Sequence, residues 1–319
     1  MIPFPAVVDS SMFATFKACP QKFFRSSMEH WKGKGESIHL HAGKAFADGL
    51  EAARRAFYEQ ELDAESAIEA GGAALMESYG DFQPGEGEAK TLDRMLGALV
   101  FYFDVWPLER NGNSAKPHVM PSGKLGIEFS FAEPLGYRHP QTGDPIIYCG
   151  RADMISDYAD GLYIQDEKTT SQLGASWSRK WDLRSQFIGY TWAAKHNNLP
   201  VNGVLVRGVS ILKTKYDKAE AITNFSLWEV ERWYNRVLRD LARMEDMWRR
   251  TPREGYNAWD YDLDEACTAY GGCQFTQVCK SPEPESWLPM YFERRKWDPL
   301  TRTETLLLQD SPEELQSQI

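Results

Sequence analysis

The chain has few cysteines, no long hydrophobic run and no excess of positive charge. Five cysteines in 319 residues are an odd and sparse set, which argues against the disulfide framework of a small secreted domain. No stretch approaches the roughly 18 uncharged apolar residues that cross a bilayer, and the first residues lack a basic segment followed by an apolar run. We therefore expect a cytoplasmic protein that makes no contact with a membrane.

Acidic residues outnumber basic ones, 46 to 36, and the formal net charge is -10. This balance disfavours a broad electrostatic grip on duplex nucleic acid, because such affinity comes mainly from Lys and Arg neutralising phosphates. It leaves open a protein that holds divalent cations with carboxylates and carries a local basic groove.

The composition that is present suits a large globular core. Hydrophobic residues make up 42% of the chain and aromatic residues 13%, enough for one core or for a core with a smaller lobe. Apolar residues at intervals of three and four predict helices, and alternating Ile, Phe and Tyr after Pro117 predict a β-meander. The expected elements are helices over about 10–25, 41–59, 64–79 and 90–106, strands over 124–135, 144–158 and 161–170, a helix over 185–197, a strand over 203–213 and a helix over 226–250.

These elements predict an α/β fold in successive parts. Residues 1–116 are mainly helical, 117–215 form the sheet core, and 216–300 combine a long helix with a Cys-rich segment. Residues 301–319 have the composition of a polar tail.

Two neighbouring predicted strands carry carboxylates and a lysine. Asp153 lies within one strand, and Asp166 and Lys168 lie at the end of the next, where residues i and i+2 point to the same face. Two converging carboxylates suit Mg²⁺ or Mn²⁺, and a nearby lysine can activate water and stabilise negative charge. The carbonyl of Glu167 is a further candidate ligand. Alternatively, the aspartates face solvent near a hairpin and Lys168 pairs with one of them.

The context of these residues resembles the RecB-like branch of the PD-(D/E)XK nucleases. GRADMI at 150–155 is similar to that family's G-x-x-D strand, and DEKTT at 166–170 to its D-x-K-T strand. QFIGY at 186–190 is similar to the Q-x-x-x-Y helix, whose two polar side chains share a face by i, i+4 spacing. Glu128 matches an acidic position before the catalytic hairpin.

The resemblance, which covers about residues 10–280, implies a single nuclease domain over 1–300 with a restriction-endonuclease-like core, a mixed central sheet flanked by helices. It implies Mg²⁺- or Mn²⁺-dependent hydrolysis of DNA, often from ends or on single strands, in recombination, repair or replication. The resemblance also implies that a helicase or recombination protein is a partner, and that the protein acts in the host cytoplasm if it is phage-encoded. The catalytic residues that it implies are Asp153, Asp166, Lys168, Gln186 and Tyr190.

One departure from the family concerns metal binding. The family usually has a histidine four residues after a helix-opening glycine, and here that place after Gly43 holds Ala47. Candidate substitutes nearby are His39, His41, Asp48 and Glu51, with Glu128 as a further acidic candidate. Either one of them replaces the histidine or the remaining carboxylates suffice. A catalytically weak or inactive DNA-binding subunit is the alternative function.

Four of the cysteines form a second candidate site. Cys267, Cys273 and Cys279 are spaced C-x₅-C-x₅-C, and Cys19 precedes a proline near the N-terminus. The same family often carries a [4Fe-4S] cluster on one N-terminal and three C-terminal cysteines, although its commonest spacing is C-x₂-C-x₅-C. Zinc accepts the same thiolates, which leaves a zinc-stabilised interaction protein as a third hypothesis, and unrelated buried thiols are the remaining reading. Cys149 is expected to be a small buried hydrophobe.

Residues 177–184 interleave tryptophans and cations. In this segment Trp181 is flanked in the sequence by Trp177, Arg179, Lys180 and Arg184. Aromatic rings that stack on bases, beside cations that hold phosphates, are typical of proteins that bind single-stranded nucleic acid. Alternatively, the tryptophans are core residues and the cationic side chains cover apolar surface with their stems.

Overall fold

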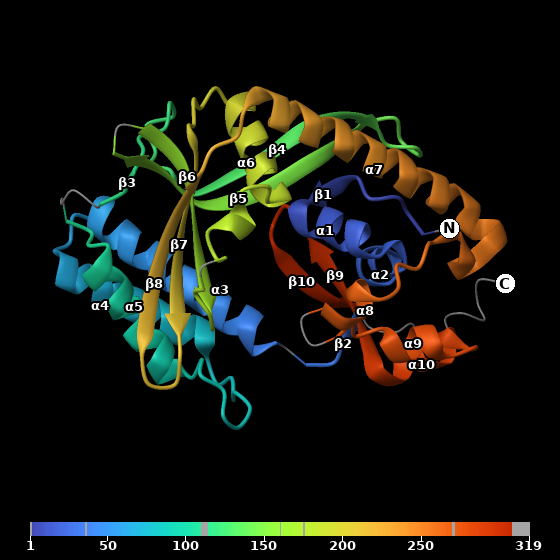
Figure 1. Cartoon of the computed structure of the whole chain (residues 1–319), viewed down its shortest axis with the longest axis horizontal. Coiled ribbons are helices and arrows are strands. Elements are labelled where there is room, and N and C mark those ends of the chain that lie inside the picture. The colour runs from blue at the N-terminus through green and yellow to red at the C-terminus, as the bar shows by residue number, and fades with distance from the viewer. Residues whose placement is uncertain are drawn as a thin grey trace. The chain divides into compact units, whose positions relative to one another are not determined.

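A mixed sheet runs through the chain, as the family resemblance implied (Figure 1). Its strand order is β1-β5-β6-β7-β8, and β3 and β4 also pair with β5. Strand β6 is antiparallel to β5 and parallel to β7, which is antiparallel to β8. The strands are β1 (Val7–Asp9), β3 (Lys116–Pro117), β4 (Ile127–Arg138), β5 (Pro145–Tyr158), β6 (Gly161–Thr170), β7 (Gly203–Ile211) and β8 (Tyr216–Thr223).

The computed structural model describes residues 2–35, 37–109, 114–159, 161–174, 176–269 and 272–307. The chain divides into two compact units, the first made of Met1–Gly35, Ala132–Gly150 and Arg232–Ile319, and the second of Glu36–Phe131 and Arg151–Glu231. Elements β4, β5 and α7 (Leu227–Glu254) contribute residues to both. Among the helices of the described residues, none is long and apolar enough to cross a membrane.

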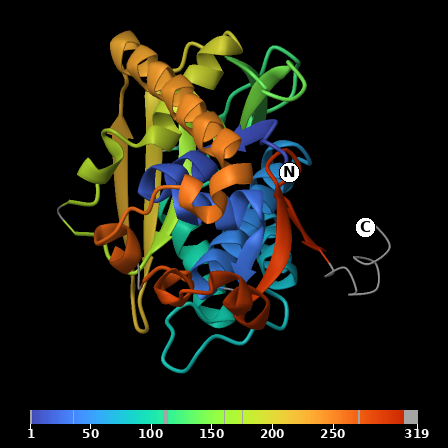
Figure 2. The ribbon, with the colours of Figure 1, turned by 90° about the vertical axis from the view of Figure 1, so that its right-hand side faces the viewer.

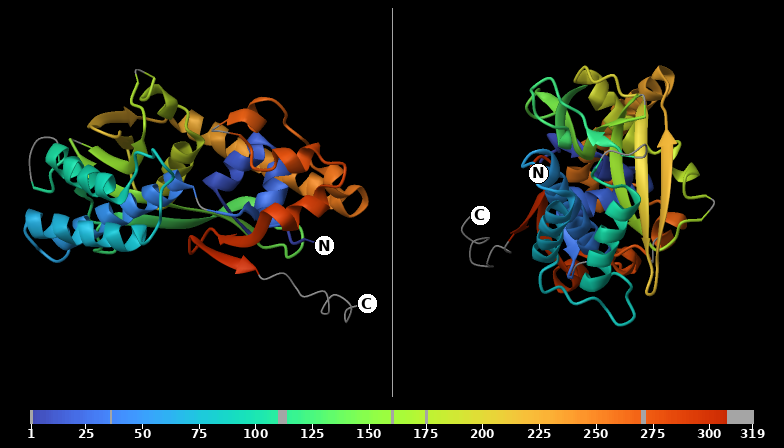
Figure 3. Two further views of the ribbon diagram at one scale, coloured as in Figure 1. Left: turned by 90° about the horizontal axis from the view of Figure 1, so that it is seen from below. Right: turned by 90° about the vertical axis from the view of Figure 1, so that its left-hand side faces the viewer.

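Three helices cover one face of the sheet in the second unit (Figure 3). They are α3 (Ile38–Tyr58), α4 (Ala64–Tyr79) and α5 (Leu92–Val105). Their apolar faces form one core with Val209 and Ile211 of β7. Asp63 and Thr91 cap the second and third helices by accepting a backbone N–H of the first turn, as side chains at helix starts commonly do.

Helices α3 and α4 approach each other closely because glycines face the contact. A Cβ atom on Gly71 would lie 2.6 Å from the carbonyl oxygen of Gly49 and 2.8 Å from Cβ of Ala53. Strand β7 is buried along its whole length, which indicates cover on both faces. Helix α6 (Ser185–His196) packs on this strand.

In the first unit, the predicted helix over 10–25 is interrupted at Cys19. Helix α1 (Ser10–Ala18) ends there, and α2 (Pro20–Phe23) continues into a π-helical turn, η1 (Phe24–Met28). Cys19 is extended, with φ -165° and ψ 111°, because a residue before proline is disfavoured in the α region. Asp9 caps α1, because its side chain accepts the backbone N–H of Met12.

A second sheet in the first unit was not predicted (Figure 2). It has the order β10-β9-β2, formed by Thr303–Leu307, Phe292–Asp298 and Trp31–Gly33. Short helices order the Cys-rich segment: η3 (Gly255–Ala258), α8 (Glu265–Thr268), α9 (Thr276–Lys280) and α10 (Pro284–Tyr291). The prediction of a polar tail from 301 was therefore wrong for 303–307, which form β10. The residues of this strand are mostly exposed, so the sequence shows no inside–outside alternation there. Residues 308–319 lie outside the described chain.

Candidate active site

The candidate site lies where strands β5 and β6 part. Their described pairing ends at Met154 and Gln165, so the next residue on each strand, Asp153 and Asp166, lies just beyond the ladder. There the Asp153 carboxylate replaces a ladder bond, because its Oδ2 accepts the backbone N–H of Glu167 at 2.7 Å. The two aspartates are thereby held close together.

Successive side chains of β6 point to opposite faces of the sheet, so its polar residues divide between the two faces. Asp166 and Lys168 share one face, and Lys168 Nζ forms an ion pair with Asp166 Oδ1. The Asp166 side chain is only 3% exposed, whereas that of Lys168 is 33% exposed. The lysine therefore reaches the solvent side of the pair, where a substrate would approach.

The aspartate pair is poorly suited to carrying two negative charges by itself. Burial raises the pKa of Asp153, and the charges of Asp166 and Glu167 raise it further. Burial also raises the pKa of Asp166, although the Lys168 ammonium opposes this. Burial would lower the pKa of Lys168, but the two aspartates outweigh it and raise that pKa. A divalent cation would favour ionisation of both carboxylates.

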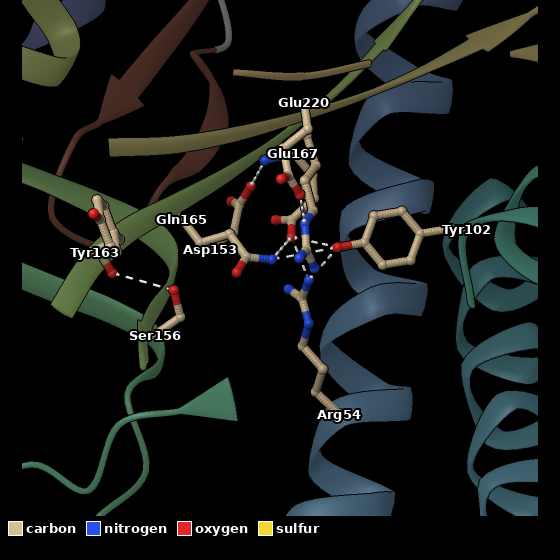
Figure 4. A network of polar contacts seen from close by, with 9 residues as sticks. Arg54, Tyr102, Asp153, Ser156, Tyr163, Gln165, Glu167 and Glu220 are labelled. Carbon is tan, nitrogen blue, oxygen red and sulfur yellow. Dashed lines mark hydrogen bonds and ion pairs between the residues drawn. The ribbon is translucent and has the colours of Figure 1, made fainter. Parts of the chain in front are cut away.

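Glu167 turns its carboxylate into a buried network on the opposite face (Figure 4). Its Oε1 accepts Arg54 Nη2, the Tyr102 hydroxyl at 2.9 Å and Gln165 Nε2 at 2.6 Å. Burial would raise the pKa of Glu167, but the Arg54 charge and these hydrogen bonds lower it to about 2. Arg54 thus holds Oε1, whereas Oε2 is buried without a hydrogen-bond partner among the described residues. The metal ligand predicted from Glu167 is its backbone carbonyl.

Two further acidic residues lie near the site. The Glu128 side chain is only 8% exposed and forms an ion pair with Arg151. Its backbone φ is positive, at 54°, and such strain in a non-glycine residue often marks a functional position. Burial raises its pKa to about 7, opposed by Arg151 and reinforced by the charge of Glu51. Glu51 itself accepts Arg55 Nε at 2.8 Å. Each of these carboxylates is thus paired with an arginine, and both remain predicted additional ligands.

The raised pKa of Glu128 predicts a pH effect on stability in the presence of a chelator. Because the folded-state pKa of about 7 lies above the ordinary value of 4.5, its contribution is fully present below pH 4.5 and is lost as the pH rises to 7. Between these values, the free energy of unfolding should fall by up to about 3 kcal/mol more in the wild type than in Glu128→Gln. Denaturant titrations at both pH values test this, and an equal fall in both proteins would contradict it.

Helix α6 brings two predicted residues to the Asp166–Lys168 face. Gln186 Nε2 donates to the Tyr190 hydroxyl at 3.1 Å, so these side chains share a helix face as their spacing predicted. Tyr190 also packs edge-on against Phe131, with ring centroids 5.4 Å apart, and lies within electrostatic reach of Lys168.

The aspartate pair fits a hard divalent cation. Magnesium sites commonly use one or two carboxylates and complete the shell with water and substrate oxygens. Within the described ranges, no group of three or more His, Cys, Asp or Glu side chains converges to hold an ion. The predicted substitute His41 stacks on Phe82, and its Nε2 lies 2.8 Å from the Tyr79 carbonyl. These contacts do not favour His41 as a ligand.

Trp177 was predicted to contact DNA, but both tryptophans of this segment are core residues and leave no exposed ring face for a base. Trp177 is 4% exposed and Trp181 5% exposed, and their rings meet edge-on at 5.4 Å. Gly208 leaves room for this packing, since a Cβ atom there would lie 2.4 Å from the Trp177 ring. The alternative interpretation of buried tryptophans is confirmed.

The cations of the same segment are exposed beside the aspartates. Arg179, Lys180 and Arg184 all lie on the surface, and Lys180 Nζ lies 4.3 Å from the centroid of the Trp181 ring. Arg184 is within electrostatic reach of Asp166, and Lys180 of Lys168. Turn η2 (Arg179–Trp181) thus presents its positive charge next to the candidate site.

Four cysteines of the first unit line one cavity: Cys19, Cys267, Cys273 and Cys279. Cys279 is exposed, but partial burial still raises its pKa; nearby Arg25 opposes this, and the other three thiols add to the rise. Backbone bonds fix the C-terminal trio, with the N–H of Cys273 donating to the carbonyl of Cys267 at 2.8 Å. All five cysteines are free, and Cys149 is buried as predicted.

Comparison with known proteins places the chain in a family. The profile of the PD-(D/E)XK nuclease superfamily matches residues 10–280. No curated protein matches the chain. Among solved structures, the crystal structure of SSO0001 is 15% identical, with a TM-score of 0.27 over 63% of this chain and 73% of that chain, a likeness too low to support an argument. On the family match, which covers most of its length, the chain belongs to the PD-(D/E)XK nuclease superfamily.

Proposed function

We propose that the protein is a DNA nuclease that uses Mg²⁺ or Mn²⁺ to hydrolyse phosphodiester bonds, acting on ends or single strands. The observation that carries this proposal is the convergence of Asp153, Asp166 and Lys168 where β5 and β6 part. Isolated surface aspartates would be neither buried nor held by the neighbouring strand.

In this proposal, Asp153 and Asp166 hold the cation, with the Glu167 carbonyl, Glu51 or Glu128 as additional ligands. The bound ion would lower the pKa of a water and neutralise phosphate charge. Lys168, half-exposed beside Asp166, orients the attacking water and stabilises the charge that develops on the phosphate oxygens. Gln186 and Tyr190 present hydrogen-bonding groups to the substrate from α6.

Substrate binding is proposed to depend on a local basic surface, because the net charge of -10 offers no general attraction to DNA. Arg179, Lys180 and Arg184 supply that surface next to the aspartate pair. Three parts of the proposal rest on the family resemblance alone. They are the preference for ends or single strands, a helicase or recombination partner, and a role in recombination, repair or replication in the cytoplasm or host cytoplasm.

The mode of cleavage can be read from the products. Anaerobically purified protein is incubated with single-stranded and duplex DNA, labelled at either the 5′ or the 3′ end, in Mg²⁺ or Mn²⁺. We expect metal-dependent degradation, faster on single strands, and a ladder from one label that gives the polarity. Internal cutting of a closed circular single strand would overturn an exonuclease.

A DNA-binding subunit with little or no activity is the second candidate. Ala47, in place of the family's usual histidine, is the observation that favours it. Against it stand the intact aspartate pair and Lys168. Tight DNA binding without cleavage in either metal would select this alternative.

We also propose that Cys19, Cys267, Cys273 and Cys279 bind a [4Fe-4S] cluster with a structural role. The four thiols line one cavity, and within the described ranges no group of three or more His, Cys, Asp or Glu side chains converges to hold a metal ion. The choice of an iron-sulfur cluster over zinc rests on the family resemblance, and metal analysis distinguishes the two. The cluster would join two segments that are far apart in the sequence.

Cys273→Ala should remove the cluster, whereas Cys149→Ala, at a buried thiol outside the cavity, should leave it intact. We expect the first variant to lose the brown colour, most of its iron and sulfide, and thermal stability, because metal binding contributes to folding. Iron, sulfide and zinc analysis of anaerobic preparations checks this. A colourless wild type containing zinc would contradict the cluster.

A further inference from the structure

Arg25 is a fully buried cation that lines the cysteine cavity. Its side chain is 0% exposed and lies in the π-helical turn η1, six residues after Cys19. A π-helical turn inside a helix often marks a functional position. The one other basic residue on the cavity wall within the described ranges is half-buried Lys22.

The guanidinium of Arg25 is held by neutral groups. Its Cζ lies 4.3 Å from the centroid of the Tyr256 ring. With the Gln21 amide oriented to satisfy its hydrogen bonds, Oε1 accepts Arg25 Nε and Nη2, each at 3.2 Å, while the amide nitrogen donates to two backbone carbonyls. Gln21 is itself fully buried. These contacts fix the orientation of Arg25 without offsetting its charge.

No carboxylate forms an ion pair with Arg25 among the residues that the structure describes, and the Nη1 atom is buried there without a hydrogen-bond partner. The carboxyl group of Glu29 is within electrostatic reach, but burial raises its pKa to about 7, so much of it is neutral near that pH. An uncompensated buried charge is costly. The neighbouring cavity is where a compensating anion would bind.

We propose that Arg25 is the counter-ion of the cysteine-bound cofactor, with Nη1 donating a hydrogen bond to a cysteine sulfur. This inference rests on the cluster proposed above and is independent of the nuclease activity. Four thiolates on a [4Fe-4S]²⁺ core carry a net charge of -2, and one-electron reduction adds another negative charge. A fixed cation and a hydrogen bond to sulfur therefore favour the reduced cluster and raise its midpoint potential.

The test compares Arg25→Met and Arg25→Lys with Arg243→Met in the full-length, anaerobically purified protein. Arg243 is a matched control in the same unit, because it also lies over an aromatic ring, that of Phe16, but is 44% exposed and paired with Asp260. Iron and sulfide content and the midpoint potential are measured. In Arg25→Met we expect the equilibrium constant for reduction to fall at least tenfold, about 59 mV for one electron, with a smaller change in Arg25→Lys and none in the control.

If Arg25→Met contained as much iron and sulfide as the wild type and had the same midpoint potential, the role of Arg25 would be contradicted, but the presence of the cluster would not. A wild type without iron and sulfide would instead overturn the cluster itself. If Arg25→Met does not fold, the wild type is labelled with ¹⁵N-arginine and reduced. Pulsed EPR should then detect a ¹⁵N coupling to the cluster, and absence of that coupling would contradict the inference.

Discussion

Replacing Lys168 by alanine is expected to slow DNA cleavage by about 10²- to 10³-fold, the usual effect of removing one preorganised charge-stabilising group. Its ammonium lies beside Asp166 and is the exposed member of that ion pair, so it is placed to act on both the attacking water and the phosphate. The aspartates remain, and metal binding should therefore survive. Single-turnover rates with saturating Mn²⁺ measure the effect.

Lys180→Ala is the matched control for this prediction. Lys180 is an exposed lysine close to Lys168, but no ion pair joins it to an aspartate among the described residues. Its loss should weaken DNA binding and reduce the salt dependence by about one phosphate contact, with little change in the single-turnover rate at saturating DNA. If the single-turnover rate fell equally in the two variants, the proposed role of Lys168 in the chemical step would be contradicted.

Replacing Arg54 by methionine should lower the free energy of unfolding by about 3–5 kcal/mol, since it leaves a buried carboxylate unpaired. Arg54 and Glu167 form an ion pair in which both side chains are almost fully buried, and Tyr102 and Gln165 complete the network. Turnover should fall as well, because the backbone N–H of Glu167 positions Asp153.

Arg55→Met provides the comparison one residue further along the same helix. Arg55 is partly exposed and pairs with Glu51 and Glu59 at i, i+4 spacing, so its loss should cost less than about 1 kcal/mol. Adding Glu167→Gln to Arg54→Met should recover part of the stability by removing the unpaired charge. Denaturant titrations compare the four proteins. A loss in Arg54→Met no greater than in Arg55→Met would show that the buried pair contributes little.

Strong periodicity made much of the second unit predictable. The helix predicted over 64–79 has those bounds, and the meander of β4, β5 and β6 forms as expected. Strand β8 was missed because its central residues alternate lysine and glutamate with alanine rather than with large apolar residues. The pairing of β2 with β9 was missed because it joins segments about 260 residues apart, which no local pattern reveals. Strand β10 was missed because its mostly exposed residues show no inside–outside alternation.

The candidate site was predictable where one strand or helix sets the geometry. Spacing placed Asp166 with Lys168 and Gln186 with Tyr190. Two partners of Glu167, Arg54 and Tyr102, come from distant elements. Arg54 nevertheless gave a signal, since it is a lone charged residue among the buried positions of α3. Trp177 was misassigned because a tryptophan next to cations has the same sequence pattern whether it is buried or exposed.

Cleavage of end-labelled single-stranded DNA by the wild type and by Asp166→Asn in Mn²⁺ tests the central claim most directly. The substitution keeps the size of the buried side chain, and matching cofactor content and unfolding curves would establish that both proteins are folded. We predict rapid metal-dependent cleavage by the wild type and none above background by the variant. Cleavage at the same rate by both proteins would contradict a catalytic site built on Asp153, Asp166 and Lys168.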